Sequence, residues 1–436
     1  MSSEWPTVRL GDHVEACLGK MLDAQKNKGA PQPYLGNSNV RWGYFDLSDL
    51  AEMKFEPHEE ERYGLLSGDL VVCEGGEPGR CAIWTGPAGM KVQKALHRIR
   101  PKSSLDNYYL FYWFQLASKT GLLEPYFTGT TIKHLTGRAI AALEVPLPPI
   151  AVQRSMVDVL KQLDDRITLL RETNTTLEAI AQALFKSWFV DFDPVRAKMK
   201  GRVPEGMDEA TAALFPDSFE ETELGEVPRG WQFSSIGQFA EVIDCLHSKK
   251  PELLEAGSPY LQLNNIRDDG LLDTSSLACI SDSDYMKWTS RIEVSGGDCV
   301  ITNVGRVGAV AQIPEGFFAA MGRNMTAIRL RDEWDYPTYL IELLQSTSMK
   351  AEIDTKTDVG TILNALNVKS IPTLRCVVAP FALMKRFEDI ARPLRAAMEG
   401  NLRKANSLAL LRDTLLPRLI TGQLRLPAEQ AQLENL

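Results

Sequence analysis

The sequence predicts an α+β protein: two α/β globules separated by two long antiparallel helices that form a coiled-coil spacer. Two observations predict this fold. Long heptad patterns occupy 151–190 and 381–420, and a repeated order of strand and turn signals precedes each of them, in 1–150 and 228–380. Together they indicate an internal repeat whose halves are related by a pseudo-two-fold axis.

Apolar residues recur at alternating steps of four and three from Val152 to Phe189. Only a long α-helix brings this spacing onto one face. Prolines stand before and after the stretch but not within it. A helix of this length extends about 57 Å and therefore needs a partner helix along its side. Its predicted seam includes Leu160, Leu163, Ile167, Leu170, Leu177 and Leu184.

A second, weaker seam in 381–420 supplies that partner, and a shift of 231 positions places one seam on the other. Pro393 falls early in this pattern and Pro417 is expected to end it. Each seam carries one asparagine, Asn174 or Asn401, at different heights, and such a residue sets register at a cost in stability. The predicted contacts of the second seam are Leu394, Met398, Leu408 and Leu415.

The two globules present the same signals in the same order. Gly-Asp turns at Asp69 and Asp298 each precede an apolar strand, and the offsets of all such marks lie between 226 and 231. Strands outnumber helices, which favours two α+β globules of one architecture. The stretch 191–227 is predicted to be a linker with one short helix at Asp208–Phe215, and 421–436 is a C-terminal tail.

Composition limits the class of protein. The 436 residues suffice for two to three domains, and no apolar run approaches a membrane span. Seven cysteines without a Cys-x-x-Cys pair, and an N-terminus without a secretory pattern, indicate a cytoplasmic protein. A net charge of −9 means that any nucleic-acid contact is local or is shared with a partner chain.

Three local motifs carry a resemblance to a known family. They are the run from Leu177 to Phe192, the run from Leu415 to Gly422, and the Pro-Leu-Pro-Pro stretch at Pro146 that precedes Gln153. With these motifs and its repeat, the chain resembles the specificity subunits of type I restriction–modification systems (HsdS). The resemblance covers nearly the whole chain.

The resemblance implies a subunit that reads a bipartite, asymmetric double-stranded DNA target, one half-site per globule. The helix pair would act as a ruler and would dock two methyltransferase subunits, which restriction/translocase subunits join. Adenine-N6 methylation and ATP-dependent cleavage would belong to those partners. S-adenosylmethionine, ATP and Mg would bind there too, with no cofactor or metal on this chain.

Catalytic motifs are missing from the sequence itself. It contains no Asn/Asp-Pro-Pro-Tyr, no Walker A motif and no His-Glu-x-x-His, and its five histidines lack metal-ligand spacing. The glycines at 75–79 are more typical of a hairpin turn than of a phosphate cradle. The sequence thus predicts a non-catalytic chain. Two alternatives stay open: a two-domain coiled-coil scaffold that binds proteins or carbohydrate, and a stand-alone nucleic-acid enzyme.

Candidate DNA contacts are basic and amide side chains on strands and loops of both globules. The densest basic run lies around the strand Ala95–Ile99, where alternation places some of these side chains on one sheet face; the alternative is a solvated strand face. The candidates are Lys91, Lys94, His97, Arg98, Lys133, Lys249, Lys250, Arg306, Arg323, Asn324 and Thr361.

The end of the first long helix is apolar on more than one side. A helix of this kind needs more than one neighbour to cover it. The predicted docking face for partner subunits is made of Ile180, Phe185, Trp188 and Phe189. The alternative is that these residues pack against the chain's own globules.

Overall fold

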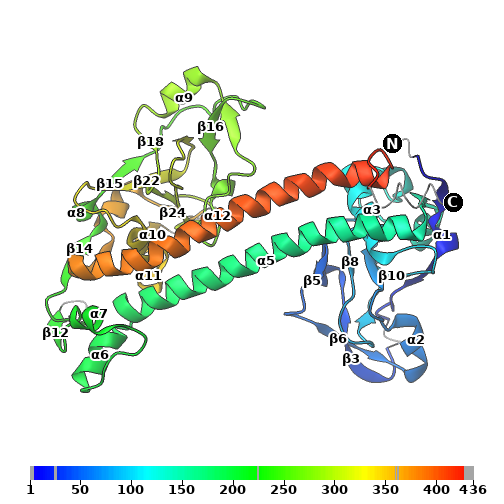
Figure 1. The fold of residues 1–436 in the computed structure, drawn as a ribbon, viewed down its shortest axis with the longest axis horizontal. Helices are drawn as coiled ribbons and strands as arrows, with labels where there is room; N and C mark the ends of the chain where they lie inside the picture. The colour runs from blue at the N-terminus through cyan, green and yellow to red at the C-terminus, as the bar shows by residue number, and fades with distance from the viewer. Residues whose placement is uncertain (1–3, 24–26, 223–224, 359, 361–362, 427–436) are drawn as a thin grey trace. The chain divides into compact units, whose positions relative to one another are not determined.

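The computed structural model of the chain describes residues 4–23, 27–222, 225–358, 360 and 363–426. The chain divides into two compact units, Met1–Ile167 with Ser407–Leu436, and Thr168–Asn406. Two 40-residue helices, α5 (Ile150–Phe189) and α12 (Phe381–Ile420), contribute to both units (Figure 1). In the described part of the chain, no helix is long and apolar enough to cross a membrane.

The first unit is built on a four-stranded antiparallel sheet with the order β2-β10-β7-β8. A three-stranded sheet, β6-β3-β9, and the pair β1-β11 accompany it. The strands are β1 (Thr7–Arg9), β2 (Val14–Leu18), β3 (Ala30–Leu35), β4 (Val40–Arg41), β5 (Tyr44–Phe45), β6 (Ala51–Phe55), β7 (Leu70–Cys73), β8 (Cys81–Ile83), β9 (Lys91–Val92), β10 (Leu96–Pro101) and β11 (Glu144–Pro146). The short helices are α1 (Leu10–His13), α2 (Glu60–Tyr63), α3 (Asn107–Lys119) and α4 (Gly137–Ala142).

The second unit has the same central sheet order, β15-β22-β19-β20, beside a mixed sheet, β17-β16-β21-β18, and the pair β14-β25. Its strands are β12 (Phe219–Thr222), β13 (Gly225–Pro228), β14 (Gln232–Ser235), β15 (Ala240–Asp244), β16 (Ser258–Leu261), β17 (Ala278–Ile280), β18 (Glu293–Val294), β19 (Cys299–Thr302), β20 (Val310–Gln312), β21 (Ala319–Met321), β22 (Met325–Leu330), β23 (Thr357–Asp358), β24 (Ala365–Leu366) and β25 (Arg375–Val378). Its further helices are α6 (Asp193–Met199), α7 (Glu209–Ala213), α8 (Ile236–Phe239), α9 (Asp282–Trp288), α10 (Pro337–Gln345) and α11 (Thr347–Lys356).

The repeat of topology extends to individual interactions. Buried Asp69 pairs with Arg100 at 2.7 Å in the first unit, and buried Asp298 pairs with Arg329 at the corresponding place in the second. In both units an asparagine, Asn39 or Asn265, ties a turn together through its side-chain amide. The predicted mixed α+β fold with two long helices is therefore confirmed. The pseudo-two-fold relation between the halves stays a prediction.

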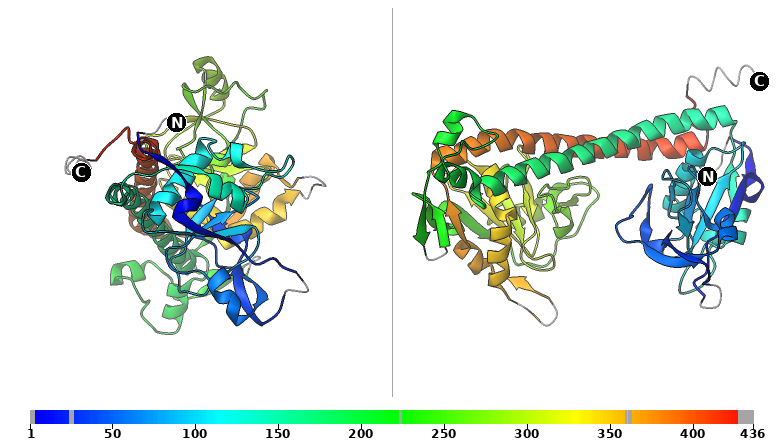
Figure 2. Two further views of the ribbon diagram at one scale, coloured as in Figure 1. Left: turned by 90° about the vertical axis from the view of Figure 1, so that its right-hand side faces the viewer. Right: turned by 90° about the horizontal axis from the view of Figure 1, so that it is seen from below.

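Within each unit, segments of α5 and α12 lie side by side and run antiparallel (Figure 1, Figure 2). In the first unit Arg412 contacts Asp164 at 2.5 Å, and the apolar ends of both segments share one core. In the second unit Asn401 donates to the side-chain oxygen of Asn174 at 3.0 Å, and Asn174 donates to the carbonyl of Met398 at 2.8 Å. The expectation that the two asparagines lie at different heights is wrong, because antiparallel packing brings them together.

The predicted seam faces inward. Leu160, Ile167, Leu170 and Met398 are buried, and the other seam leucines are half-buried: Leu163, Leu177, Leu184, Leu394, Leu408 and Leu415. Helix α12 continues through Pro393 and Pro417 to Ile420, the bounds predicted for it, so only the expected end of the seam pattern at Pro417 is wrong. A proline removes one backbone hydrogen bond, but Leu416 and Leu419 are fully buried, and this packing holds the helix together beyond it.

The stretch 191–227 contains α6, α7 and the hairpin β12-β13 rather than a plain linker. The short helix expected at Asp208–Phe215 is α7, whose first turn is capped by the Asp208 carboxylate accepting from the Thr211 N–H at 2.7 Å. Val195 and Phe215 are buried in the core of the second unit. This packing explains why the stretch is ordered despite its glycines and prolines.

Candidate nucleic-acid interface

Three loops of the second unit gather several of the predicted DNA contacts. The loop after β15 carries Lys249 and Lys250, both exposed, and the Lys250 ammonium donates to the side-chain oxygen of Gln262 at 3.2 Å. Gln262 begins the turn after β16. This bond joins the lysine loop to the end of the mixed sheet.

The turn between β21 and β22 carries Arg323 and Asn324, which are also exposed. Its backbone is fastened on two sides: Gly322 donates to the carbonyl of Leu261 at 3.0 Å, and Asn303 donates to that of Asn324 at 2.8 Å. Asn324 has a φ of +64°, a conformation that asparagine tolerates better than most residues. The turn is thus held beside the Gln262 turn and the β19–β20 turn.

Arg306 lies on the turn between β19 and β20 and is half exposed. Its guanidinium donates to the carbonyl of Ile266 at 2.8 Å and forms an ion pair with the almost fully exposed Asp268. We call the resulting set the second-unit loop surface: Lys250, Gln262, Arg306, Arg323 and Asn324. Its donors and amides suit phosphate oxygens and base edges.

The corresponding candidates of the first unit lie inside the protein. Lys91 is 2% exposed, and its ammonium donates to Glu60 at 2.5 Å. His97 is 1% exposed, and burial lowers the pKa of its imidazole. Arg98 is 6% exposed and donates to the carbonyl of Glu61 at 2.8 Å. The prediction of an accessible basic face on this strand is therefore wrong for these three residues, and they leave the candidate interface.

For His97 and Arg98 the physical reason is the position of β10 in its sheet; Lys91 lies on β9, in the three-stranded sheet. Strand β10 lies between β2 and β7, and apolar clusters cover the sheet on both faces, with Ile99 in one cluster and Leu96 in the other. Alternation exposes every second side chain only when one face of a sheet meets water. Arg100, from the same basic run, forms the internal ion pair with Asp69.

Two candidates of the first unit stay at its surface. Lys94 is half-buried, and Lys133 is exposed on a turn joined by backbone bonds between Thr128 and His134. The Lys133 ammonium lies 5.7 Å from the centre of the Phe127 ring. Thr361, the remaining candidate, lies outside the described residues. Contact of the remaining candidates with DNA stays a prediction.

The predicted docking face is mostly core. Three of its four residues are buried: Phe185 and Trp188 are 3% exposed, and Phe189 is 6% exposed. All three pack with Phe387, whose ring centre lies 5.6 Å from that of Phe185, 6.2 Å from that of Trp188 and 5.3 Å from that of Phe189. The alternative interpretation, packing against the chain's own globule, is correct for these three. Ile180 is 49% exposed and remains available.

Comparisons with known proteins bear on the identity of the chain. Residues 2–179 match the family model of the type I restriction modification DNA specificity domain. The MjaIX specificity subunit of Methanocaldococcus jannaschii is 23% identical over 368 residues, which are 82% of this chain and 78% of that protein. The HindI specificity subunit of Haemophilus influenzae is 24% identical over 336 residues, 67% and 72% of the two chains. Residues 2–179 thus carry this DNA specificity domain, and most of the chain is similar to specificity subunits of the HsdS family.

The fold agrees with this assignment. The crystal structure of the type I restriction-modification S subunit from M. genitalium matches with a TM-score of 0.58 over 96% of both chains, at 16% identity. The likeness of fold to this S subunit thus extends over nearly the whole of both chains. The relatives of this chain are named as specificity subunits, and the prediction of a non-catalytic chain is confirmed at the level of the family. The scaffold alternative is not favoured.

Sequence reasoning missed Gln262. Its turn is held by Asn265, whose side-chain oxygen accepts from the Gln262 N–H at 2.8 Å and whose amide donates to the carbonyl of Asp273 at 3.0 Å. In the first unit Asn39 makes the same bonds to Gly36 and Asp46. The repeated pairing of an asparagine with a following Asp-x-Ser was the available signal, since an offset of 226 aligns the asparagines and one of 227 aligns the Asp-x-Ser motifs.

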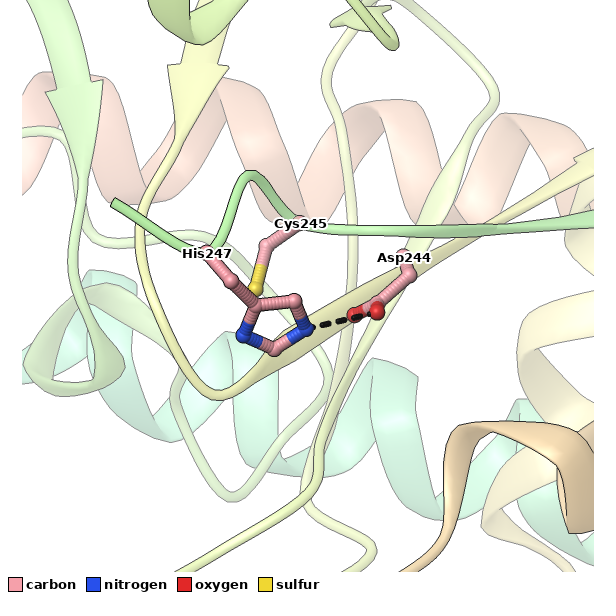
Figure 3. A group of neighbouring side chains, drawn as sticks. All are labelled: Asp244, Cys245 and His247. Atoms are coloured by element: carbon pink, nitrogen blue, oxygen red, sulfur yellow. Dashed lines mark hydrogen bonds and ion pairs between the residues drawn. The ribbon is translucent and has the colours of Figure 1, made fainter.

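One group of side chains in this protein has the composition of a metal site. Asp244, Cys245 and His247 bring a carboxylate oxygen, a thiol sulfur and an imidazole nitrogen within 4.8 Å of one another (Figure 3). Asp244 ends β15, and Cys245 and His247 lie in the loop that leads to Lys250. The absence of a metal on this chain stays a prediction.

Proposed function

We propose that this chain is a type I specificity subunit that reads a bipartite, asymmetric DNA target, with one recognition unit per half-site. The observation that carries the proposal is the repeat of one architecture with different loop residues. Arg306 of the second unit corresponds to Glu77 of the first, and Arg323 corresponds to Lys94. A shared scaffold with unlike loop side chains suits two half-sites of unlike sequence, because base edges are read by side-chain donors and acceptors.

The decisive experiment maps methylation. The chain is co-expressed with the methyltransferase subunit of its own host, and modified adenines are mapped across random DNA. We expect a split motif with two fixed half-sites and an unread spacer. Exchange of residues 1–150 for those of another family member should then change one half-site only. A contiguous motif, or a change in both half-sites, contradicts one unit per half-site.

We further propose that the long helices dock two methyltransferase subunits. In α5, exposed residues recur at steps of four and three along one face beside the seam: Leu169, Thr173, Thr176, Ile180 and Ala183. Leu169 and Ile180 are 50% and 49% exposed, unusual for large apolar side chains on a helix. We call this set the α5 stripe. It replaces the buried aromatic residues as the proposed docking face.

The repeat supports two copies. Its offset of 231 maps Ile180 on α5 onto Leu411 on α12, and Leu411 is 46% exposed. Each copy would use one of these two apolar positions. S-adenosylmethionine, ATP and Mg are proposed to bind to the methyltransferase and restriction/translocase partners. This chain's residues would supply recognition and assembly.

The docking proposal is tested by co-purification. Ile180→Asp and Leu411→Asp should each leave one methyltransferase subunit per specificity subunit, and the double variant none, because a charge in an apolar contact is costly. Thr175→Asp is the matched control, since Thr175 is exposed on another face of the same helix. Full methyltransferase binding by the double variant contradicts the proposal. Loss of binding with Thr175→Asp as well also contradicts it, because the effect would then come from disruption of the helix and not from the two apolar positions.

A further inference from the structure

The end of β15 and the loop after it hold three potential metal ligands in four residues. The Nε2 atom of His247 lies 2.7 Å from one oxygen of Asp244, and Cys245 stands between them in the chain (Figure 3). His247 is exposed, Asp244 is half-buried, and Cys245 is 2% exposed. The three ligand types are those that zinc prefers in proteins.

The surroundings position the sulfur and the carboxylate. Burial raises the pKa of the Cys245 thiol, while backbone N–H groups of Met325 and Asn324 donate to the sulfur and act in the opposite direction. The second oxygen of Asp244, Oδ1, is buried and makes no regular hydrogen bond to any residue that the structure describes, although the thiol lies near the carboxyl group. A buried carboxylate oxygen in this state is an acceptor that a cation would satisfy.

Arg291 is the positive group that competes with a cation here. Its guanidinium lies 3.6 Å from the Asp244 carboxylate and donates to the carbonyl of Cys245 at 3.0 Å. The Arg291 side chain is 46% exposed and can turn to water. Because ion pairs that reach solvent contribute little, this pair is weak competition for a metal bound by a thiolate and an imidazole.

We propose that Asp244, Cys245 and His247 bind a divalent transition metal of the zinc class through Oδ, Sγ and Nε2. Bonds of about 2.0 Å to oxygen and nitrogen and about 2.3 Å to sulfur place tetrahedral ligand atoms roughly 3.3–3.6 Å apart. The His247–Asp244 pair must open by less than about 1 Å to admit the ion, and its exposed loop allows this. The metal bonds to the thiolate, and the thiol proton leaves to water. A water molecule completes the coordination.

The site belongs to the second unit alone. The repeat offset of 226 places Leu18, Gly19 and Met21 at the corresponding positions of the first unit, and none of them offers a strong ligand. The ion would fix the loop that carries Lys249 and Lys250. The metal-site inference itself rests on geometry and not on the proposed reading of DNA.

The test uses the purified full-length chain and the metals alone. Zn²⁺ titrated against a chromophoric chelator should bind one equivalent, and Co²⁺ should give a thiolate-to-cobalt charge-transfer band in the near ultraviolet. Cys245→Ser should abolish that band, and His247→Ala should weaken Zn²⁺ affinity roughly 100-fold or more. Cys279→Ser and His13→Gln are the matched controls outside the cluster and should change neither readout.

The inference is overturned by no Zn²⁺ binding by the unaltered chain, by an unchanged cobalt band in Cys245→Ser, or by equal loss in the controls. His247 is exposed, so His247→Ala is expected to fold, and a near-ultraviolet circular dichroism spectrum identical to that of the unaltered chain checks this. Tight Zn²⁺ binding that survives His247→Ala in the folded chain also overturns the three-ligand site.

Discussion

The two units share a sheet order and an internal Asp–Arg pair, yet they differ at the places where polar groups are buried. The first unit encloses Lys91, His97 and Arg98. The repeat offset of 229 places Ala320, Thr326 and Ala327 at these positions in the second unit. The densest basic run of the sequence therefore contains side chains that are buried inside the first unit. The accessible basic groups of the second unit sit on scattered turns.

The junction between globule and helix differs in the same way. In the first unit Tyr112 donates to Asp164 at 2.7 Å, and Arg412 completes the group. The repeat places Glu342 and Arg395 of the second unit at the positions of Tyr112 and Asp164. Both are buried there. The two junctions thus bury polar side chains at corresponding positions but use different residue types.

The largest expected effect separates core from docking surface. Trp188→Ala should lower the unfolding free energy of the second unit by about 3–5 kcal/mol, because its ring is 3% exposed and packs 5.3 Å from that of Phe215. Ile180→Ala should stay within about 0.5 kcal/mol. Denaturant unfolding of the full chain measures both. A stable Trp188→Ala that loses methyltransferase binding would restore the docking role predicted from sequence.

The shared ion pair should matter equally in both units. Asp69→Ala and Asp298→Ala should each cost about 1–3 kcal/mol, because each removal leaves a backbone N–H without its buried acceptor and breaks an ion pair with a partly exposed arginine. Hydrogen exchange should rise in β7 for the first variant and in β19 for the second. Asp268→Ala, which breaks the exposed pair with Arg306, is the control and should change exchange in neither strand. Effects confined to one unit would show that the ion pair does not contribute equally to the stability of the two units.

The junctions should differ in their response to pH. Burial raises the pKa of Glu342 to about 7, against the opposing effect of Arg395. The folded state therefore holds this proton more tightly than the unfolded state, so the contribution of Glu342 to stability falls as pH rises from about 4.5 to about 7.

Glu342→Gln should flatten this dependence, which unfolding of the second unit at about pH 5 and about pH 7.5 would measure. Tyr112 has a pKa raised by burial and stays protonated throughout, so the first unit should show no matching slope from this position. An unchanged slope in Glu342→Gln would assign the pH dependence to other groups.

The smallest effect concerns DNA. Lys250→Ala should weaken DNA binding by the assembled complex roughly twofold to tenfold and reduce the salt dependence by about one ion, as expected for one phosphate contact. Lys91→Ala should lower the stability of the first unit and leave the salt dependence unchanged, because its ammonium is buried. If Lys91→Ala reduced the salt dependence of DNA binding and Lys250→Ala did not, the interface would lie on the basic run of the first unit.

Much of the fold was predictable because its signals are local and periodic. The heptads of α5 and α12 and the Gly-Asp turns each lie in a continuous stretch of sequence, and the repeat provided an independent check on each. The candidate site was less predictable. Strand pairing brings the turns of Gln262 and Asn324 together, although they lie about 60 residues apart in the sequence. A local sequence pattern does not indicate such proximity.

The sequence by itself determined the two long helices, the duplication and the family, because periodicity and repeated motifs are properties of the order of residues. Only the tertiary structure decided which polar and aromatic side chains reach water. His97 and Arg98 lie on a strand covered on both faces, and Phe185 and Trp188 lie where a globule closes over the helix. Exposure depends on neighbours distant in the chain, so the tertiary structure separates scaffold from surface.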